Sequence, residues 1–369
     1  MGYEMVREPF MLYETVAMLY KYVNGITFAS VLSRMKLKQG AHTTKALARR
    51  LNRLQMIMED VCSGLDPKDA LLQRYFGRTV SGGEETCLAS LLTESFGPPS
   101  SMGLLEDMER IGQAWQKHQS SGAWIRNDSP NALSFSNEMG SPGDLFAQIT
   151  ALELPPELKL NLYGVLRNFD ASQRELTALM LPLAQRLEEY YRQEIWLLEE
   201  TAAYWEEIFD KKHPIAFLRA HIDNALLENA VSETKVGILL MDCSHIHYWL
   251  RSNPDDIADQ DFICIGCGIN SASITRRQSA DLETVGEILK AMGDKRRLEV
   301  LRRLSKDRMY LHELAEVMDM DPGSMSRILA TLHNHGFLRQ ERQALRNYYQ
   351  TDRETIHGFL ELVETLIFE

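Results

Sequence analysis

The stretch LHELAEVMDMDPGSMSRILATLHNHGFL, residues 311–338, decides the fold of the C-terminal part of this chain. Its first third has apolar residues at helical spacing, which predicts a short helix over 310–318. Pro322 suits the first turn of a second helix, because the amide hydrogen that proline lacks is not needed there. Gly336 is expected to end that helix. Two short helices joined by a tight turn are typical of a helix-turn-helix, whose second helix enters the major groove of DNA.

The segments that follow predict a positively charged hairpin. Residues 337–342 and 346–351 have the length and composition of two strands joined by a short turn. We expect phosphate or minor-groove contacts from the arginines of this wing, Arg339, Arg342 and Arg346. Base edges would be met by the residues near the start of the second helix, Ser324, Ser326 and Arg327.

Further helices are expected on both sides of this motif. An apolar-periodic helix over 282–292 ends at Gly293, and Asp294 caps the next one, 295–305. The chain closes with an amphipathic helix over 355–368. We therefore assign residues 281–369 to a winged helix-turn-helix domain.

Residues 289–350 resemble the winged-helix domain of ArsR-type transcriptional repressors. The pieces that carry the resemblance are LKAMGDKRRLEVLRRL, the stretch quoted above, and RQALRNYYQ. The resemblance implies DNA contacts at Arg297 and at the helix and wing residues already named. It also implies a homodimer, formed through helices 282–291 and 354–368, that reads two half-sites of a double-stranded DNA operator.

The sequence departs from this family where many members sense metals. No cysteine lies in residues 311–318, and Asp352 and His357 have no partners at the spacing of a metal site. Metal sensing within the winged helix is therefore not expected.

The composition sets the class of the whole protein. The 369 residues suffice for two or three domains, and 44% hydrophobic and 25% charged residues are ordinary for a soluble globular chain. The formal net charge of −12 argues against non-specific nucleic-acid binding, yet residues 295–346 hold eleven Lys and Arg against seven Asp and Glu. Five cysteines and the lack of a long apolar run favour a cytoplasmic protein without a membrane span.

The predicted fold class is mostly α with small β elements, or α+β. We expect a helical N-terminal region, 1–270, with a small sheet near 232–268, followed by a linker at 271–280. A long helical run, 170–210, should kink or break near Pro182. The size of this region exceeds what DNA binding needs, so it is the candidate for dimer geometry and for binding a small-molecule effector.

A group of cysteines and histidines in the expected sheet suggests a metal site. Thiolate and imidazole suit zinc, and the candidates are Cys243, His245, His247, Cys264 and Cys267. The alternative is that these are buried strand residues, since free cysteine packs as a small hydrophobe. The second interpretation leaves the protein without a metal or cofactor.

No catalytic motif is evident, and we expect no enzyme. Phosphate-binding loops, the H-E-x-x-H zinc motif and the G-x-S-x-G nucleophile elbow are all missing, and Asp242 near His245 and His247 is the one acid–histidine cluster that suggests chemistry. The sequence thus predicts a cytoplasmic, dimeric, sequence-specific DNA-binding transcriptional regulator, in particular a repressor. Two alternatives are a winged-helix scaffold for protein contacts and a regulator that senses metal or thiol chemistry through Cys243, His245, Cys264 and Cys267.

Overall fold

The computed structural model divides the chain into two compact units. It describes residues 2–39, 45–81, 84–121, 124–129, 132–136, 144–219, 233–249, 261–271, 282–343 and 346–368. Unit 1 comprises residues 1–27 and 52–269, and unit 2 comprises residues 28–51 and 270–369. The expected linker, 271–280, lies outside the described residues except for Ser271. Unit 2 also contains residues 28–51, a segment that the sequence analysis grouped with the N-terminal region.

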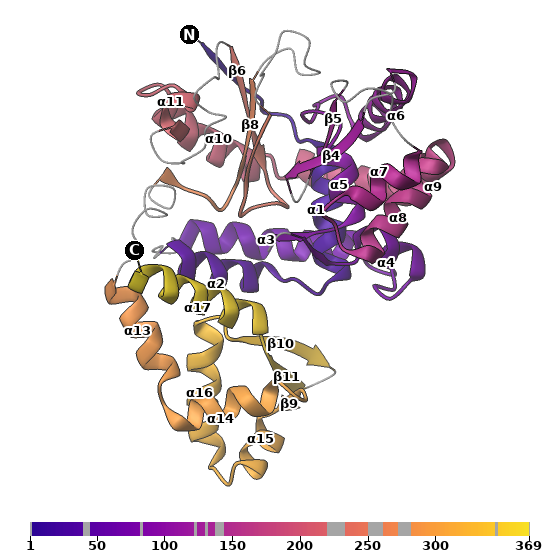
Figure 1. Ribbon diagram of the computed structural model, residues 1–369. Coiled ribbons are helices and arrows are strands. Elements are labelled where there is room, and N and C mark those ends of the chain that lie inside the picture. Colours follow the sequence, from indigo (N-terminus) through magenta and orange to yellow (C-terminus); the bar gives the residue numbers. More distant parts are fainter. Residues whose placement is uncertain are drawn as a thin grey trace. The chain divides into compact units, whose positions relative to one another are not determined.

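Helices dominate the described part of unit 1 (Figure 1). They are α1 (Met11–Val23), α4 (Ala70–Phe76), α5 (Leu88–Glu94), α6 (Leu104–Ser121), α7 (Leu145–Ala151), α8 (Pro156–Arg167), α9 (Phe169–Gln193), α10 (Trp196–Phe209) and α11 (Pro214–Arg219). The helix α3 (Lys45–Val61) begins in unit 2 and ends in unit 1. The long run predicted over 170–210 breaks at Glu194 and Ile195, whereas Pro182 lies inside α9. The break therefore lies at Glu194 and Ile195 and not near Pro182, and a kink at Pro182 stays a prediction.

A four-stranded sheet forms the β part of unit 1. Its order is β1 (Tyr3–Met5), β6 (Thr234–Leu239), β8 (Asp261–Gly266) and β7 (Ile246–Trp249). The first three strands are parallel, and β7 runs antiparallel to β8. Every residue of β8 is buried, as expected for a central strand covered on both faces. Because Leu239 pairs with Gly266, the carboxyl ends of β6 and β8 meet at one edge of the sheet.

Two hairpins complete the described strands of unit 1. The strand β2 (Thr79–Ser81) pairs with β3 (Glu84–Thr86), and β4 (Trp124–Ser129) pairs with β5 (Ala132–Ser136). Phe135 of β5 stacks on His118 of α6, with ring centroids 3.8 Å apart. This hairpin therefore closes over an aromatic cluster that also contains Phe96 and Trp115.

Unit 2 has the order of elements of a winged helix. Its elements are α2 (Phe28–Gln39), α13 (Leu282–Met292), α14 (Lys295–Leu304), β9 (Met309–Tyr310), α15 (Leu311–Val317), α16 (Pro322–Asn334), β10 (Leu338–Gln343), β11 (Arg346–Thr351) and α17 (Arg353–Phe368). The three strands form an antiparallel sheet in the order β10-β11-β9. Beyond the expected motif, α2 packs against α17, and both can be followed in Figure 1.

One apolar core joins these helices and the sheet. Its fully buried side chains include Val300, Leu304, Leu314, Met325 and Phe337. Gly336 has a positive φ of 77°, and the turn after α16 is closed by the Phe337 amide, which donates to the Leu332 carbonyl at 2.9 Å. This left-handed helix end is why glycine stands at this position.

The fold class agrees with the sequence: the protein is mostly α with small sheets, and a helix-turn-helix lies near its C-terminal end. Among the helices that the structure describes, none combines the length and apolar character needed to cross a bilayer.

Candidate nucleic-acid interface

Local hydrogen bonds set the two helices of the helix-turn-helix. The Tyr310 amide donates to the Glu313 carboxylate at 3.1 Å, which closes the start of α15. Asp321 caps α16 by accepting from the Ser324 amide at 2.8 Å. Between the helices Asp319 takes a φ of 48°, a left-handed conformation that aspartate tolerates better than most residues. The tight turn expected from the sequence is thus present.

The polar face of α16 lies at the surface. Ser326 and Arg327 are exposed and Ser324 is half-buried, while Met325 and Leu329 are buried on the opposite face. One Arg327 nitrogen, Nη2, donates to the Ser324 hydroxyl at 3.2 Å. This hydrogen bond orients the Arg327 side chain. Because a guanidinium has five N–H donors, Ser324 accepts from only one of them. The face therefore presents a cation between two small hydroxyls.

Two more cations, Arg346 of the wing and Arg308 just before β9, lie over tyrosine rings. The Arg346 guanidinium lies 4.5 Å from the Tyr310 ring centroid, and Arg308 lies 5.7 Å from that of Tyr348. The two rings meet edge to face at 5.7 Å, because Tyr310 of β9 pairs with Tyr348 of β11. Arg308 and Arg346 are both exposed. Sequence analysis missed Arg308 and the tyrosines, because a two-residue strand gives no periodic signal.

Arg339 has a structural role that the sequence did not indicate. Its Nε donates to Asp352 Oδ2 at 2.9 Å, and its Nη2 donates to Asp352 Oδ1 at 3.3 Å. The Asp352 side chain is only 3% exposed, and it also caps α17 through the Thr355 amide. The guanidinium therefore compensates a buried carboxylate, and the phosphate or minor-groove contact expected of Arg339 stays a prediction.

The Arg297 side chain also forms a hydrogen bond within the domain, in this case to a backbone carbonyl. Its Nη1 donates to the Ala291 carbonyl, near the C-terminal end of α13, at 2.9 Å, and the residue is half-buried. A cation at a helix C-terminus is stabilised by the helix dipole, so this contact ties α13 to α14. The Arg342 backbone lies in β10, but its side chain is outside the described residues.

The cysteines proposed as metal ligands are core residues of unit 1. Cys243, Cys264 and Cys267 are buried, and none of them forms a disulfide. Burial raises the pKa of Cys264 well above its usual value, which disfavours the thiolate that binds metals. Cys267 Sγ donates to the Leu240 carbonyl at 3.5 Å. In the described part of the chain, His245 instead groups with Asp242 and His247, without a cysteine.

Comparison with known proteins supports the helix-turn-helix. Residues 295–342 match the IclR helix-turn-helix domain family, which covers a minor part of the chain. One solved structure found by the comparison is the homodimeric winged helix-turn-helix DNA-binding domain of a possible ArsR-family transcriptional regulator from Mycobacterium bovis. It is 24% identical, covers 24% of this chain and 84% of that chain, and has a TM-score of 0.20. No curated protein matches the chain.

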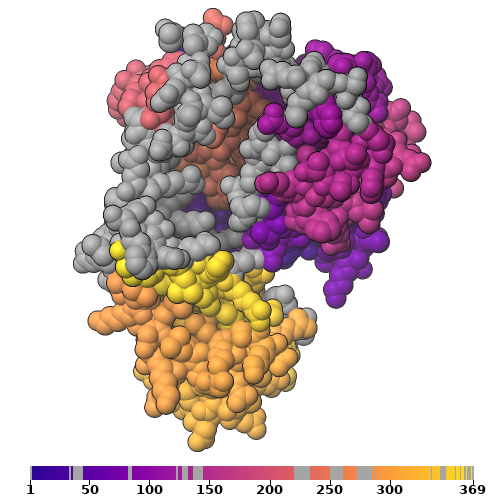
Figure 2. Space-filling view, in the orientation of Figure 1, coloured from indigo at the N-terminus to yellow at the C-terminus, as the bar shows by residue number. Residues whose placement is uncertain are grey.

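The elements α16, β10 and β11 all belong to unit 2, and the last part of the chain is orange and yellow in Figure 2. The sequence predicts a domain of the ArsR type. The matching domain family is that of IclR, so the finer ArsR assignment is not established. The chain carries a C-terminal helix-turn-helix domain similar to that of the IclR family, which indicates a DNA-binding transcriptional regulator.

Proposed function

We propose that this protein binds double-stranded DNA sequence-specifically through α16 and the wing, as a homodimeric transcriptional repressor. The observation that carries the proposal is the exposed polar face of α16, where Arg327 lies between Ser324 and Ser326. Guanine offers two acceptors in the major groove that match an arginine fork, and serine hydroxyls can bond any base edge or a phosphate.

The wing supplies the sequence-independent part of the affinity. Arg346 and Arg308 are exposed cations over tyrosine rings, and arginine contacts to phosphates release counterions from DNA. Residues 295–346 hold eleven Lys and Arg against seven Asp and Glu on a chain of formal net charge −12. This segment would also orient the protein, because the acidic remainder of the chain is repelled by phosphate.

Substitution of two arginines tests the proposal. DNA fragments are selected from a random pool with the full chain, and affinity is then measured over a range of salt concentrations. Arg327→Ala should cost about 1–3 kcal/mol and relax base preference at one position. Arg346→Ala should weaken all sequences alike and reduce the salt slope by about 1.

Arg302→Ala is the matched control, because Arg302 is an exposed arginine of α14 that pairs with Glu299. It removes the same charge without touching α16 or the wing. Equal losses in all three variants would leave only a non-specific charge effect. Retention of full affinity and base preference by Arg327→Ala would refute DNA reading by α16, and failure of the full chain to select any DNA would favour a winged-helix scaffold for protein contacts.

Homodimerisation is supported by apolar side chains that stay exposed on the outer helices of unit 2. Leu289 of α13 is 43% exposed, and Leu360 and Ile367 of α17 are 50% and 64% exposed. Following the resemblance to ArsR-type repressors, we propose that these two helices form the dimer contact and that the protein represses transcription. Leu360→Glu should shift the sedimentation of the full chain from that of a dimer to that of a monomer. Repression is tested separately, by measuring transcription of a reporter gene with and without the protein.

Effector control would belong to unit 1, which is larger than DNA binding requires. Its test must use the full chain, because a fragment that starts at residue 281 lacks α2, the helix that packs on α17. Operator affinity is compared with and without candidate metabolites. If a metabolite changes the affinity for operator DNA by some factor, operator DNA must change the affinity for that metabolite by the same factor.

A further inference from the structure

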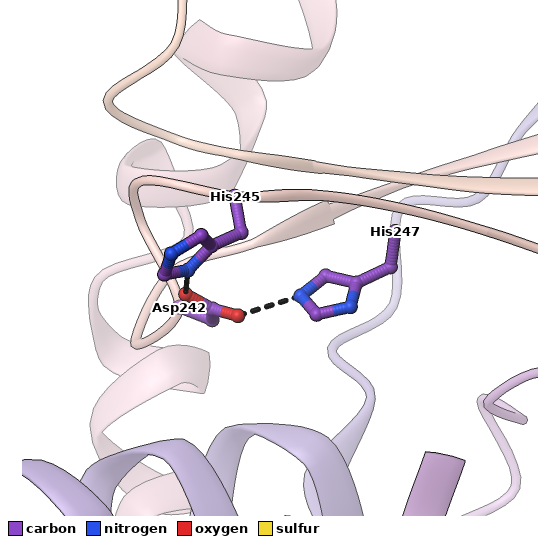
Figure 3. Close-up of side chains that lie close together, drawn as sticks. All are labelled: Asp242, His245 and His247. Atoms are coloured by element: carbon purple, nitrogen blue, oxygen red, sulfur yellow. Dashed lines mark hydrogen bonds and ion pairs between the residues drawn. The ribbon is translucent and has the colours of Figure 1, made fainter. Parts of the chain in front are cut away.

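Three polar side chains meet at the edge of the unit 1 sheet where β6 and β8 end. Asp242 follows β6, His245 lies before β7, and His247 lies within β7. Figure 3 shows the Asp242 carboxylate between the two imidazoles. Asp242 Oδ1 lies 2.6 Å from His245 Nδ1, and Oδ2 lies 2.6 Å from His247 Nε2. One carboxylate is thus shared by two histidines.

These three side chains offer the donor atoms of a transition-metal site. One ligand atom from each residue lies within 4.8 Å of the other two. A tetrahedral zinc ion with bonds of about 2.0–2.1 Å holds its ligand atoms roughly 3.3 Å apart. Small side-chain rotations would therefore admit an ion in place of the hydrogen-bonded protons. Two imidazoles with one carboxylate favour zinc and other divalent first-row transition metals over calcium and magnesium, which prefer all-oxygen ligands.

A second carboxylate lies behind His247, as in many metal sites. His247 Nε2 faces Asp242, while its Nδ1 lies 3.8 Å from Glu94 Oε2. Histidine ligands commonly donate their second nitrogen to such a carboxylate, which fixes the tautomer and the ring orientation. The ring also stacks on Trp249 at an interplanar angle of 18°. His247 thus directs Nε2 to Asp242, while the Glu94 carboxylate lies within ion-pair distance of its other nitrogen.

The turn that carries Asp242 is fixed by contacts from distant parts of the chain. The buried Glu14 of α1 accepts from the Leu240 and Met241 amides at 2.7 Å each. The Gly266 and Gly268 amides, after β8, donate to the His245 and Cys243 carbonyls at 2.9 and 2.8 Å. A Cβ at Gly266 would come within 2.4 Å of the Cys243 backbone, so glycine is needed for this close approach. The site therefore has a rigid base.

The three side chains differ in their exposure to solvent. The side chains of Asp242 and His247 are 18% and 20% exposed, whereas that of His245 is 65% exposed. An ion could enter past His245 and keep water in its remaining position, as three-ligand zinc sites do.

We propose that Asp242, His245 and His247 bind one divalent first-row transition-metal ion, of which Zn²⁺ is the representative, with Glu94 orienting His247. The proposal does not rest on DNA binding and concerns unit 1 alone. Binding replaces the protons on His245 Nδ1 and His247 Nε2 by the metal ion, and any proton displaced from these nitrogens passes to the solvent.

Zinc titration of the untagged full chain tests the proposal. The chain is stripped with a chelator, and ZnCl₂ is added in competition with a chromophoric chelator to measure stoichiometry and affinity. We expect one ion per chain. His245→Ala and His247→Ala should each lower the affinity by more than about 100-fold, and Glu94→Gln by about 10–100-fold, the range measured for outer partners of metal ligands.

His245→Ala is the decisive variant, because this residue is largely exposed and its loss should not affect folding. His357→Ala, an exposed histidine of α17, is the matched control and should bind as the wild type does. Cys243→Ala should also keep full affinity. Absence of zinc binding, undiminished affinity in both histidine variants, or an equal loss in Cys243→Ala would overturn the proposal.

Discussion

The helix-turn-helix and the Asp242 cluster are built by opposite strategies. In the helix-turn-helix, the contacts that set each element join residues close in sequence, such as Asp321 with Ser324 and Tyr310 with Glu313. The Asp242 cluster depends on α1, α5 and the end of β8, which are far apart in the chain. The comparison teaches that a motif can be predicted when its stabilising contacts are local.

The chain offers separate reporters for the two regions. Its five tryptophans, at positions 115, 124, 196, 205 and 249, all lie in unit 1. Tryptophan fluorescence therefore follows unfolding of unit 1, and far-ultraviolet circular dichroism follows both units. Comparison of the two signals therefore assigns an unfolding transition to each unit. A single unfolding midpoint for the whole chain would not separate them.

Glu14→Ala should produce the largest effect and sharpen the comparison. Burial raises the pKa of Glu14 to about 7, and its carboxylate accepts from two amides and from the Tyr191 hydroxyl at 2.8 Å. Its loss leaves buried donors without an acceptor, at a cost of about 3–5 kcal/mol. Urea unfolding followed by tryptophan fluorescence measures it. Glu14→Gln, which keeps one acceptor, should lose less; equal losses would refute the hydrogen-bond argument.

Arg339→Ala is the corresponding change in unit 2. It leaves the carboxylate of Asp352 buried without its cation, which should cost about 3 kcal/mol. The loss should appear in circular dichroism but leave the tryptophan transition in place. Arg346→Ala, which removes an exposed arginine, should change stability by less than about 0.5 kcal/mol.

A double variant separates the two causes of that loss. In Arg339→Ala/Asp352→Asn no buried charge remains, so part of the stability should return. If the double variant were less stable than Arg339→Ala alone, the uncompensated carboxylate could not be the main cost.

Acid should destabilise unit 1 through His118, with the smallest effect of the three. Burial lowers the pKa of His118 to about 4, from 6.5 in an unfolded chain. Between pH 6.5 and pH 4, His118 is protonated in the unfolded state and neutral in the folded state. The free energy of unfolding therefore falls as pH decreases through this range. Solvent exposure of the half-buried ring limits the loss to about 1–2 kcal/mol.

The measurement is the pH dependence of the tryptophan transition. His118→Phe keeps the stacked ring against Phe135 and has no titrating group, so its stability should vary less over this pH range. If the stability of the wild type and of His118→Phe changed equally with pH, His118 would be excluded as the cause of the acid destabilisation.

The two regions also differ in how well their functional residues could be predicted. Ser324, Ser326 and Arg327 lie on the outer face of α16 as expected, because helical periodicity alone separates them from Met325 and Leu329. The roles of Arg297 and Arg339 could not be predicted, since their partners Ala291 and Asp352 are neighbours only after folding.

The segment that the sequence analysis singled out, with Cys243, His245, His247, Cys264 and Cys267, also contains Asp242. Alternation along a strand cannot say which side chains leave the core, and here all three cysteines point into it. Asp242 and Glu94 complete the group of polar side chains because the turn after β6 faces α5.

The sequence by itself determined the order of helices, turn and wing near the C-terminal end, since periodicity, caps and turn residues act over a few positions. It also determined the fold class, through the balance of helical and strand-length apolar segments. Only the tertiary structure decided which arginines remain available to a ligand and which compensate buried groups. It alone brought Asp242, His245, His247 and Glu94 together, because that proximity depends on strand pairing and helix packing across long stretches of chain.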